Sequence, residues 1–203
     1  MALDAGLLRS RLPGLELVYL ETTPSTMTEA ARLAAAGSPA GAMVVAGEQT
    51  AGQGRQGRTW YSEAEAGLYV SIVLRPELAP GALPTLTLAL GVALQEAIAA
   101  STGVRCSLKW PNDVLAGGKK CAGILCTAAG AAVIAGFGVN VNHDAFPPEL
   151  AGSATSLKMV SGRLQSREDL LVELASSVDR YCRLLAEQGP DRVVRLYTER
   201  ARG

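Results

Sequence analysis

An α+β fold, with one mixed β-sheet and helices packed on one side of it, is predicted for this chain by three features. Short runs rich in β-branched residues recur along the chain. Stretches rich in alanine and leucine, with the spacing of helices, separate several of these runs. At 203 residues with 48% hydrophobic content, the chain can bury one sizeable core, so we expect residues 1–203 to form a single domain.

The first half of the chain alternates strand and helix signals. A strand is expected at 15–20, followed by a helix that begins near Thr26 and ends at Gly37, a typical C-terminal stop. A second strand is expected at 42–46 and a third at 67–74, with a glycine-rich loop between them. The loop therefore connects two strands of the predicted sheet.

The second half begins with a long helix, predicted over about 81–101, and continues into three strand candidates at 104–109, 119–127 and 132–141. Gly117-Gly118 and Ala129-Gly130 mark the turns before the last two strands. Ser166 to Asp169 has the form of a capping box and opens an amphipathic helix. A short helix over about 190–200 is expected to end the domain.

Composition narrows the class of protein. The formal net charge is zero and lysine and arginine form no run outside the loop, so we expect no DNA partner. The four cysteines show no C-x-x-C spacing and the single histidine stands apart, so we expect no zinc site and buried, reduced thiols. The longest apolar stretch, 83–100, is interrupted by polar residues, so neither export nor membrane insertion is indicated, and a cytoplasmic location is predicted.

The loop reads G-E-Q-T-A-G-Q-G-R-Q-G-R-T-W from Gly47 to Trp60. Glycines let backbone N–H groups approach a ligand closely, and guanidinium groups of Arg55 and Arg58 suit phosphate. Gly52 to Gly57 has the spacing of a dinucleotide fingerprint and nearly that of a P-loop, but both motifs require a helix to follow, and a strand follows instead. We therefore exclude both motifs; a solvated surface loop is the alternative that remains.

A second polar constellation, K-W-P-N-D, occupies 109–113 at the end of a predicted strand, and Lys120 lies in the strand that returns. This corner could bring a lysine close to the arginine loop. A plain turn is the alternative for Pro-Asn-Asp, because those residue types fit turns for local reasons. For Lys120 alone, the alternative is a solvated surface charge.

Taken together, five segments resemble the biotin protein ligases, also called biotin–acetyl-CoA-carboxylase ligases. The matching segments are Ser25-Thr26, the loop Q-T-A-G-Q-G-R-Q-G-R-T-W, K-W-P-N-D, K-C-A-G-I-L from Lys120, and G-F-G-V-N-V-N from Gly136. The resemblance covers roughly residues 15–200, in family order. Within the wider group that includes lipoate ligases and octanoyltransferases, the loop followed by K-W-P-N-D is specific to the biotin ligases.

The resemblance implies a class II aminoacyl-tRNA synthetase-like, biotin–lipoate ligase-like catalytic domain. It implies that biotin and ATP, with Mg²⁺, give biotinyl-5'-AMP, and that a lysine of a biotin carboxyl carrier protein or domain then attacks this anhydride. It also implies a short form, without the DNA-binding N-terminal domain or the C-terminal domain of relatives, and so no repressor role. Pairing of two copies into a homodimer through sheet edges is left open.

The resemblance also implies residue roles. Arg55 and Lys120 are the expected catalytic residues, and Ser25, Thr26, Gln49 and Gly123 are expected to contact biotin. The expected nucleotide-binding residues are Gly54, Arg55, Arg58, Trp60, Asn112, Asp113, Lys120 and Asn140. No metal ligand is assigned. A helix cap is the alternative for Thr26, and ordinary packing of a large ring is the alternative for Trp60.

Two positions depart from the family pattern. Gln53 stands where relatives usually carry arginine, so one cation is missing from the expected phosphate site. Met27 stands where asparagine often follows Ser-Thr, and its thioether is free to pack instead. These departures keep two other functions open: a lipoate or octanoate attachment enzyme of the same fold, and a biotin-binding sensor without turnover.

Overall fold

Seven strands form one sheet in the part of the chain that the structure describes, residues 3–77 and 81–201 of a computed structural model. The strands are β1 (Leu17–Thr23), β2 (Met43–Gln49), β3 (Gly67–Leu74), β4 (Ser107–Lys109), β5 (Asp113–Ala116), β6 (Lys119–Ala129) and β7 (Ala132–Asn140). Their order across the sheet is β1-β2-β3-β7-β6-β5-β4. Only β1 and β2 pair in parallel, so the predicted mixed sheet is confirmed.

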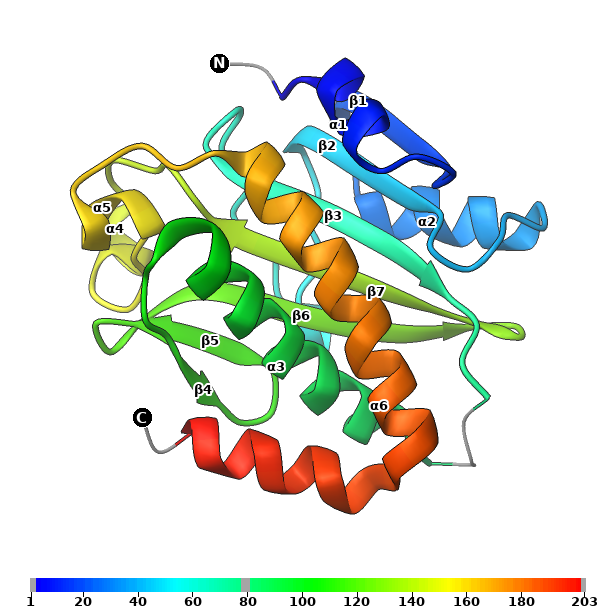
Figure 1. Ribbon diagram of the computed structural model, residues 1–203. Coiled ribbons are helices and arrows are strands. Elements are labelled where there is room, and N and C mark those ends of the chain that lie inside the picture. The colour runs from blue at the N-terminus through cyan, green and yellow to red at the C-terminus, as the bar shows by residue number, and fades with distance from the viewer. Residues whose placement is uncertain (1–2, 78–80, 202–203) are drawn as a thin grey trace.

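Helices account for most of the remaining chain. They are α1 (Ala5–Arg11), α2 (Thr26–Ala35), the single 3₁₀ turn η1 (Arg55–Gly57), α3 (Leu83–Thr102), α4 (Pro148–Ala151), α5 (Leu157–Ser161) and α6 (Arg167–Ala201). Helix α6 is broken where Gly189 takes a φ of 74° immediately before Pro190. The break turns the chain, so a separate final segment crosses below α3 in Figure 1, as the sequence predicts for 190–200.

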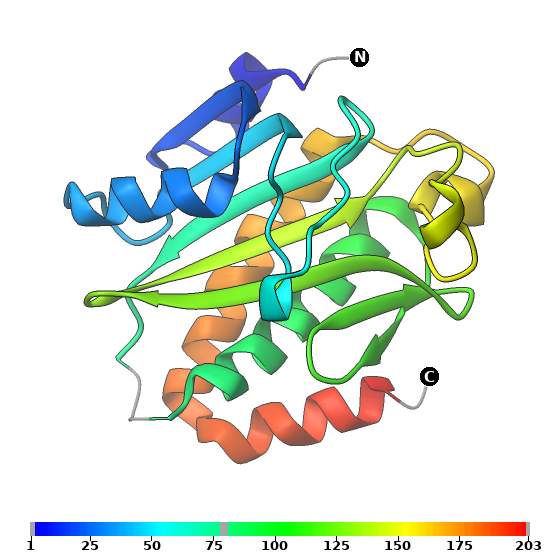
Figure 2. The ribbon, with the colours of Figure 1, turned by 180° about the vertical axis from the view of Figure 1, so that it is seen from behind.

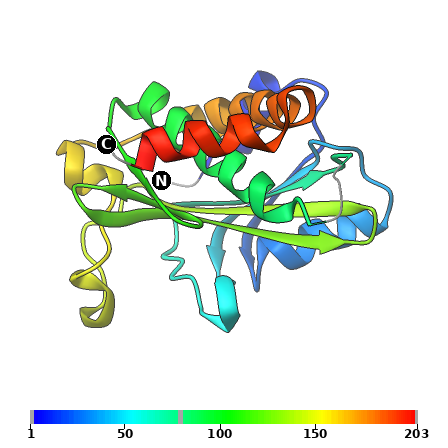
Figure 3. The same ribbon diagram turned by 90° about the horizontal axis from the view of Figure 1, so that it is seen from below.

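The sheet separates two apolar clusters of different size. Helices α3 and α6 pack together on one face and enclose the main core, as predicted, whereas α2 departs from the prediction and lies on the other face (Figures 1 and 3). The other face carries α2 at the end formed by β1, β2 and β3, where a smaller cluster includes Met27, Val44 and Ile134. Among the described residues, no α-helix covers the rest of that second face, and the loop between β2 and β3, with η1 at its tip, projects from it (Figure 3).

Helix α3 is the central element of the main core. It is long and apolar enough to cross a membrane when judged by length and composition alone. Leu86, Leu90, Leu94 and Ile98 along it are fully buried against the sheet and α6. Its apolar character is thus explained by burial inside the protein.

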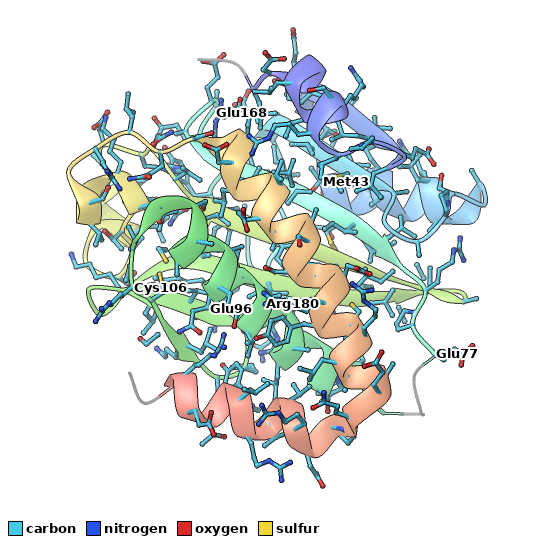
Figure 4. All side chains as sticks on the ribbon, in the orientation of Figure 1. Met43, Glu77, Glu96, Cys106, Glu168 and Arg180 are labelled. Atoms are coloured by element: carbon cyan, nitrogen blue, oxygen red, sulfur yellow. The ribbon has the colours of Figure 1, made fainter. Side chains whose placement is uncertain are left out.

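A charged cluster joins α3 to both parts of α6. Glu96 on α3 accepts hydrogen bonds from Arg180 at 2.5 Å, from the Tyr181 hydroxyl at 2.7 Å, and from Arg200 (Figure 4). Burial raises the pKa of Glu96, but the hydrogen bond from Tyr181 and the pairing with Arg200 and Arg180 outweigh it, so the pKa lies below its ordinary value. One carboxylate therefore holds the segment after the Gly189 break against the core.

Replacing Glu96 with alanine is expected to lower the free energy of unfolding by about 2 kcal/mol, because hydrogen bonds to a partly buried charged group are lost. Since the folded pKa is depressed, this stabilisation is present above the ordinary pKa of 4.5 and disappears as the pH falls through the folded value. Urea unfolding of Glu96→Ala and of Glu173→Ala, an exposed glutamate on α6, measures it. Equal unfolding midpoints for the two variants would contradict this assignment.

Most predicted elements are present, and the differences concern short segments, which include the unpredicted η1, α4 and α5. The strand predicted at 104–109 is ordered as a strand only at 107–109, because β5 offers partners for those three residues alone. Strand β5 was not predicted, since Pro-Asn-Asp and Gly-Gly leave too few residues between them for a pattern. Helix α1 was not predicted either. Its N-cap is Asp4, whose carboxylate accepts from Leu7 N.

Candidate active site

The uncovered part of the second sheet face has a floor of glycines. Gly123 of β6 pairs with Gly138 of β7, and Leu125 pairs with Gly136, so the three glycines share one face of the sheet. The loop between β2 and β3 lies over these strands when the molecule is seen from behind (Figure 2). Without side chains on this floor, a flat group can lie directly against the backbone.

Trp60 lies on this floor. A Cβ at Gly138 would come within 2.4 Å of the Trp60 ring, so this position requires glycine with the ring in this place, and a Cβ at Gly123, at 3.0 Å, would force the ring to shift slightly. The Trp60 Nε1 is buried and has no hydrogen-bond partner among the residues that the structure describes. An unpaired buried donor costs about 1–3 kcal/mol, which favours movement of the ring to a site where the donor is paired.

A β-bulge directs Lys120 toward the same face. Val114 pairs with Ala122, but the next residue of β5, Leu115, pairs with Lys120, so Cys121 is an extra residue in β6. Cys121 and Ala122 both join the core on the helix side, whereas Lys120 lies with Gly123 on the open side. Bulges of this kind re-aim side chains next to functional sites.

Neighbouring residues contact both the side chain and the backbone of Lys120. Its Nζ lies 2.7 Å from Asp113 Oδ1 and 5.2 Å from the centre of the Trp60 ring. Its backbone N–H donates to Ser153 O at 2.8 Å, and its carbonyl accepts from Thr155 N at 2.9 Å. The backbone bonds thus fix the main chain of Lys120 and Asp113 holds its ammonium group, both without a ligand.

The glycine-rich loop is a small hairpin. Gln53 forms a bridge with Thr59, Trp60 N donates to Gly52 O at 2.9 Å, and η1 forms the tip. Arg55 Nη1 donates to Asn112 Oδ1 at 3.3 Å, and Asn112 Nδ2 donates to Ile124 O at 2.9 Å. These bonds connect the loop through the K-W-P-N-D corner to β6, where Lys120 lies.

A cluster of polar side chains lies at the other end of the glycine floor, under α2. The Thr26 hydroxyl lies 2.8 Å from Ser71 Oγ and 3.1 Å from Gln49 Oε1, and the Thr26 N–H donates to the same Oε1 at 2.8 Å. Gln49 Nε2 donates to Ser62 Oγ at 3.0 Å. The Ser25 hydroxyl is buried and has no hydrogen-bond partner in the described part of the chain. These polar groups are preorganised by one another, and Ser25 has hydrogen-bonding capacity left.

Two cavities meet at Trp60, Arg55, Asn112 and Lys120. The inner pocket, of about 50 Å³, is bounded by Thr26, Met27, Gln49 and the glycine floor. The outer pocket, of about 760 Å³, extends from the loop to the segment around α4. Trp60 stands between them, so rotation of its ring would enlarge the inner pocket.

The charged side chains that line the outer pocket are mostly positive. Four cationic side chains line it, and Asp113 is the one carboxylate among its described lining residues. The cations are Arg55, Arg58, Lys109 and Lys120. Because the chain as a whole has no formal net charge, this local excess of positive charge points to an anionic ligand with several charges.

The wall beside the outer pocket contains the only histidine of the chain. His143 is fully buried, stacks on Phe146 with ring centroids 5.0 Å apart, and lies 3.4 Å through Nε2 from the Tyr69 hydroxyl. Burial lowers its pKa to about 4. His143 is therefore neutral near neutral pH and supports the wall structurally.

Acid is expected to destabilise the fold through His143. The unfolded chain takes up this proton near pH 6.5 and the folded chain only near pH 4, so stability falls by up to about 3 kcal/mol across that window. Urea unfolding at neutral pH and at about pH 4 measures it in the parent and in His143→Phe, which keeps the ring stack. An equally steep loss of stability in both proteins would contradict this role.

Most residues predicted for the site line one or both of the two pockets. Arg55, Lys120, Trp60 and Asn112 line both pockets; Thr26, Gln49 and Gly123 line the inner one, and Arg58, Asp113 and Asn140 the outer one. Gly54 lines both. The cap considered for Thr26 is wrong, because Ser25 is the N-cap residue and Thr26 the first residue of the helix. Asn140 donates to Thr155 O at 3.1 Å, which ties the α4–α5 segment to the sheet.

Several residues at the site were missed from the sequence. Gly136 and Gly138 alternate along β7 with period two, a signal that places both on one face and that could have identified the floor. Ser71 and Lys109 also went unassigned. Met27 packs against Gly136, where a Cβ would lie 2.5 Å from its sulfur, so the thioether fills space as expected. Gln53 donates to Thr28 Oγ1 at 3.4 Å and supplies no cation.

Comparison with known proteins gives the family. Residues 19–144 match the model of the biotin/lipoate A/B protein ligase family. The bifunctional ligase/repressor BirA of Bacillus spizizenii is 40% identical over 171 residues, which cover 81% of this chain and 53% of the relative. The biotin–[acetyl-CoA-carboxylase] ligase of Mycobacterium tuberculosis is 39% identical over 165 residues, 76% of this chain and 61% of the relative. The chain thus spans little more than half the length of these relatives.

Solved structures agree with the sequence comparison. The biotin protein ligase of Aquifex aeolicus in complex with biotin and ATP is 33% identical, with a TM-score of 0.79 over 87% of this chain and 74% of that one. The Leishmania major enzyme in complex with biotinyl-5-AMP is 25% identical, with a TM-score of 0.80 over 91% and 81%. The architecture, the match across residues 19–144 and these likenesses establish that the chain belongs to the biotin/lipoate A/B protein ligase family.

Proposed function

We propose that this chain is the catalytic domain of a biotin protein ligase, which activates biotin as biotinyl-5'-AMP and transfers it to a lysine of a biotin carboxyl carrier domain. One observation carries the proposal: a pocket lined by four cations adjoins a pocket with preorganised polar groups, and Lys120 and Arg55 lie at their junction. A carboxylic acid bound in one pocket and a triphosphate in the other would meet at these two side chains.

Biotin is assigned to the inner pocket. Its ureido group has both donors and an acceptor, which suit the amide of Gln49 and the hydroxyls of Thr26 and Ser25. Ser25 lines neither pocket in this structure; its buried hydroxyl, which has no partner in the described residues, gains one when the inner pocket opens toward it. The glycine floor at Gly123 admits the ligand against the backbone once Trp60 has rotated away from it. A volume of about 50 Å³ is too small for the ligand before that rotation.

ATP is assigned to the outer pocket. Arg55, Arg58 and Lys120 offer charge-assisted hydrogen bonds to phosphate oxygens. Gly54 lets the backbone of the loop approach them. Trp60, once it has left the floor, offers an aromatic surface to the adenine ring, and Asn112 and Asn140 offer amides at the rim. The carboxylate of biotin is thereby directed toward the α-phosphorus.

In the first step, a carboxylate oxygen of biotin attacks the α-phosphorus, the bond to the bridging oxygen breaks, and pyrophosphate leaves. Negative charge grows on the phosphoryl oxygens during this step. Lys120 and Arg55 are placed before the reaction begins, so they stabilise that charge without reorganisation. Asp113 keeps the Lys120 ammonium in position through their 2.7 Å contact.

Magnesium accompanies ATP in such reactions, and the residues present fit a metal held mainly by the phosphates. No cluster of three or more His, Cys, Asp or Glu side chains occurs in the described parts of the chain. Asp113 is the carboxylate that would share the ion, with Asn112 beside it in the outer pocket. Bound there, magnesium would neutralise charge on the departing pyrophosphate.

In the second step, the neutral amine of the acceptor lysine attacks the acyl carbon of the adenylate, and AMP leaves. The loop covers the mixed anhydride meanwhile, which limits its hydrolysis by water. The acceptor we propose is the carrier domain of a biotin-dependent carboxylase such as acetyl-CoA carboxylase, in the cytoplasm.

A transfer assay tests the whole proposal. The chain, a recombinant biotin carboxyl carrier domain, biotin and magnesium ATP are incubated, and the carrier is analysed by mass spectrometry. We expect one biotin on one lysine of the carrier, and none when ATP is omitted or when that lysine is replaced by arginine. A carrier domain that stays unmodified in the complete mixture would refute the transfer step.

A further inference from the structure

Two cysteine thiols lie close together on the helix side of the sheet, opposite the face that carries the Lys120 side chain. Cys106 precedes β4 and Cys121 is the extra residue of the bulge in β6, and their sulfur atoms are 3.9 Å apart (Figure 4 labels Cys106, on the side of the sheet that carries α3). All four cysteines are free. Within the described residues, Cys126 and Cys182 make no such sulfur–sulfur contact, so the pair is specific to these two positions.

The geometry allows a bond between the two sulfurs. A disulfide has a sulfur–sulfur distance of about 2 Å, so the two atoms must approach by about 2 Å. Gln95 Nε2 donates to the carbonyl of Cys106 at 2.6 Å and holds its backbone, so the approach requires rotation of the half-buried Cys106 side chain about its Cα–Cβ bond. Cys121 is fully buried, and its single S–H can donate either to Val114 O at 3.5 Å or to the Cys106 sulfur at 3.9 Å, so a small movement exchanges one contact for the other.

The two thiols differ in reactivity. The hydrogen bond from Cys121 lowers the pKa of Cys106, although burial opposes this effect. The same hydrogen bond and burial raise the pKa of Cys121. The more exposed thiol is therefore also the better thiolate, which is the arrangement of an attacking cysteine beside a resolving one.

We propose that Cys106 and Cys121 are a redox site, which closes to a disulfide with a low-molecular-weight disulfide such as oxidised glutathione as the oxidant. The Cys106 thiolate attacks one glutathione sulfur, forming a mixed disulfide and releasing the first glutathione thiol. The Cys121 thiol then loses its proton and attacks the Cys106 sulfur, and the second glutathione leaves as a thiol. Two electrons pass from the protein to the oxidant, and a dithiol reductant reverses both steps.

The bond has a consequence for the adjacent site, which rests on the proposed function. Cys121 follows Lys120 directly, and the bulge that they form directs Lys120 to the open face. Moving Cys121 toward Cys106 removes its contact with Val114, the neighbour of Asp113, which pairs with Lys120. A displacement of about 1 Å at a catalytic group costs up to about a hundredfold in rate, so we expect oxidation to slow adenylate formation by about tenfold to a hundredfold.

The test treats the full chain with oxidised glutathione and reads two signals. Peptide mass spectrometry after thiol alkylation detects the Cys106–Cys121 bond, and pyrophosphate release with biotin and magnesium ATP measures adenylation. We expect the parent and the control Cys182→Ala to gain the bond and lose rate, and dithiothreitol to restore both. Cys106→Ala, or Cys106→Ser should the alanine variant fold poorly, is expected to keep its rate under oxidation.

Each other outcome is decisive. Glutathione retained on Cys106 without closure, or no reaction at either thiol, overturns the disulfide. A bond that forms with no change in rate overturns its effect on Lys120. A reduced protein that releases no pyrophosphate refutes the proposed adenylation instead, while the peptide analysis still decides whether the two cysteines join.

Discussion

Replacing Lys120 with alanine is expected to slow biotin adenylation by about a hundredfold to a thousandfold, the size seen when a preorganised contact to developing charge is lost. The fold should be little affected, because the bonds of Lys120 to Ser153 and Thr155 are made by its backbone. The side chain contributes the ammonium at the junction of the two pockets. Single-turnover pyrophosphate release measures the loss.

Lys119 supplies a matched control for this experiment. It is the preceding residue of the same strand, it is exposed, and its Nζ donates to Ala151 O at 3.2 Å. Lys119→Ala removes the same charge from the chain and should leave the rate of pyrophosphate release unchanged. Near-parental rates for Lys120→Ala, or equal losses in both variants, would show that position in the site does not matter and would contradict the assigned role.

Replacing Arg55 with glycine is expected to release the adenylate about tenfold to a hundredfold faster. One charge-assisted hydrogen bond contributes about 1.5–3 kcal/mol, which corresponds to that range. The loop also loses its bond to Asn112, which connects it to the corner beside Lys120. Stopped-flow measurement of adenylate release, together with labelling of lysines on a bystander protein, detects the leak.

A second variant separates charge from flexibility. Glycine adds backbone freedom to the 3₁₀ turn that contains Arg55, whereas Arg55→Gln removes the charge and keeps an ordinary side chain. Faster release in both variants identifies the guanidinium as the group that retains the adenylate. Arg32→Gly, at an exposed position on α2, controls for general effects and should retain the adenylate normally. Parental retention by Arg55→Gly would refute the role of the loop.

The sequence predicts the sheet well where patterns are long and local. Strand β3 has the predicted bounds. The apolar spacing predicts helix α3, and the Gly189-Pro190 pair accounts for the break in α6. Strand β5 and helix α1 escape prediction because a few residues carry too little periodicity. The place of α2 on the face opposite α3 depends on contacts between Met27, Val44 and Ile134, which are far apart in the sequence.

The sequence predicts which residues belong to the site, but their positions relative to one another come only from the structure. The K-W-P-N-D corner does approach the arginine loop, through the bond between Arg55 and Asn112. Strict alternation along β6 would put Lys120 and Gly123 on opposite faces, and only the bulge at Cys121 brings them together. The ring of Trp60 lies on the glycine floor because Gly123 and Gly138 have no side chains, a cross-strand relation that local sequence does not contain.

The two pockets on the open face are proposed to bring an acyl carboxylate and a triphosphate together. The most direct test of this proposal is pyrophosphate release by the chain with magnesium ATP, supplied in turn with biotin, lipoate and octanoate, and with the adenylate identified by chromatography. We expect pyrophosphate release and biotinyl-5'-AMP with biotin, and neither with the other two acids. Release with lipoate or octanoate but not biotin, or calorimetric binding of biotin without any release, would contradict the proposal.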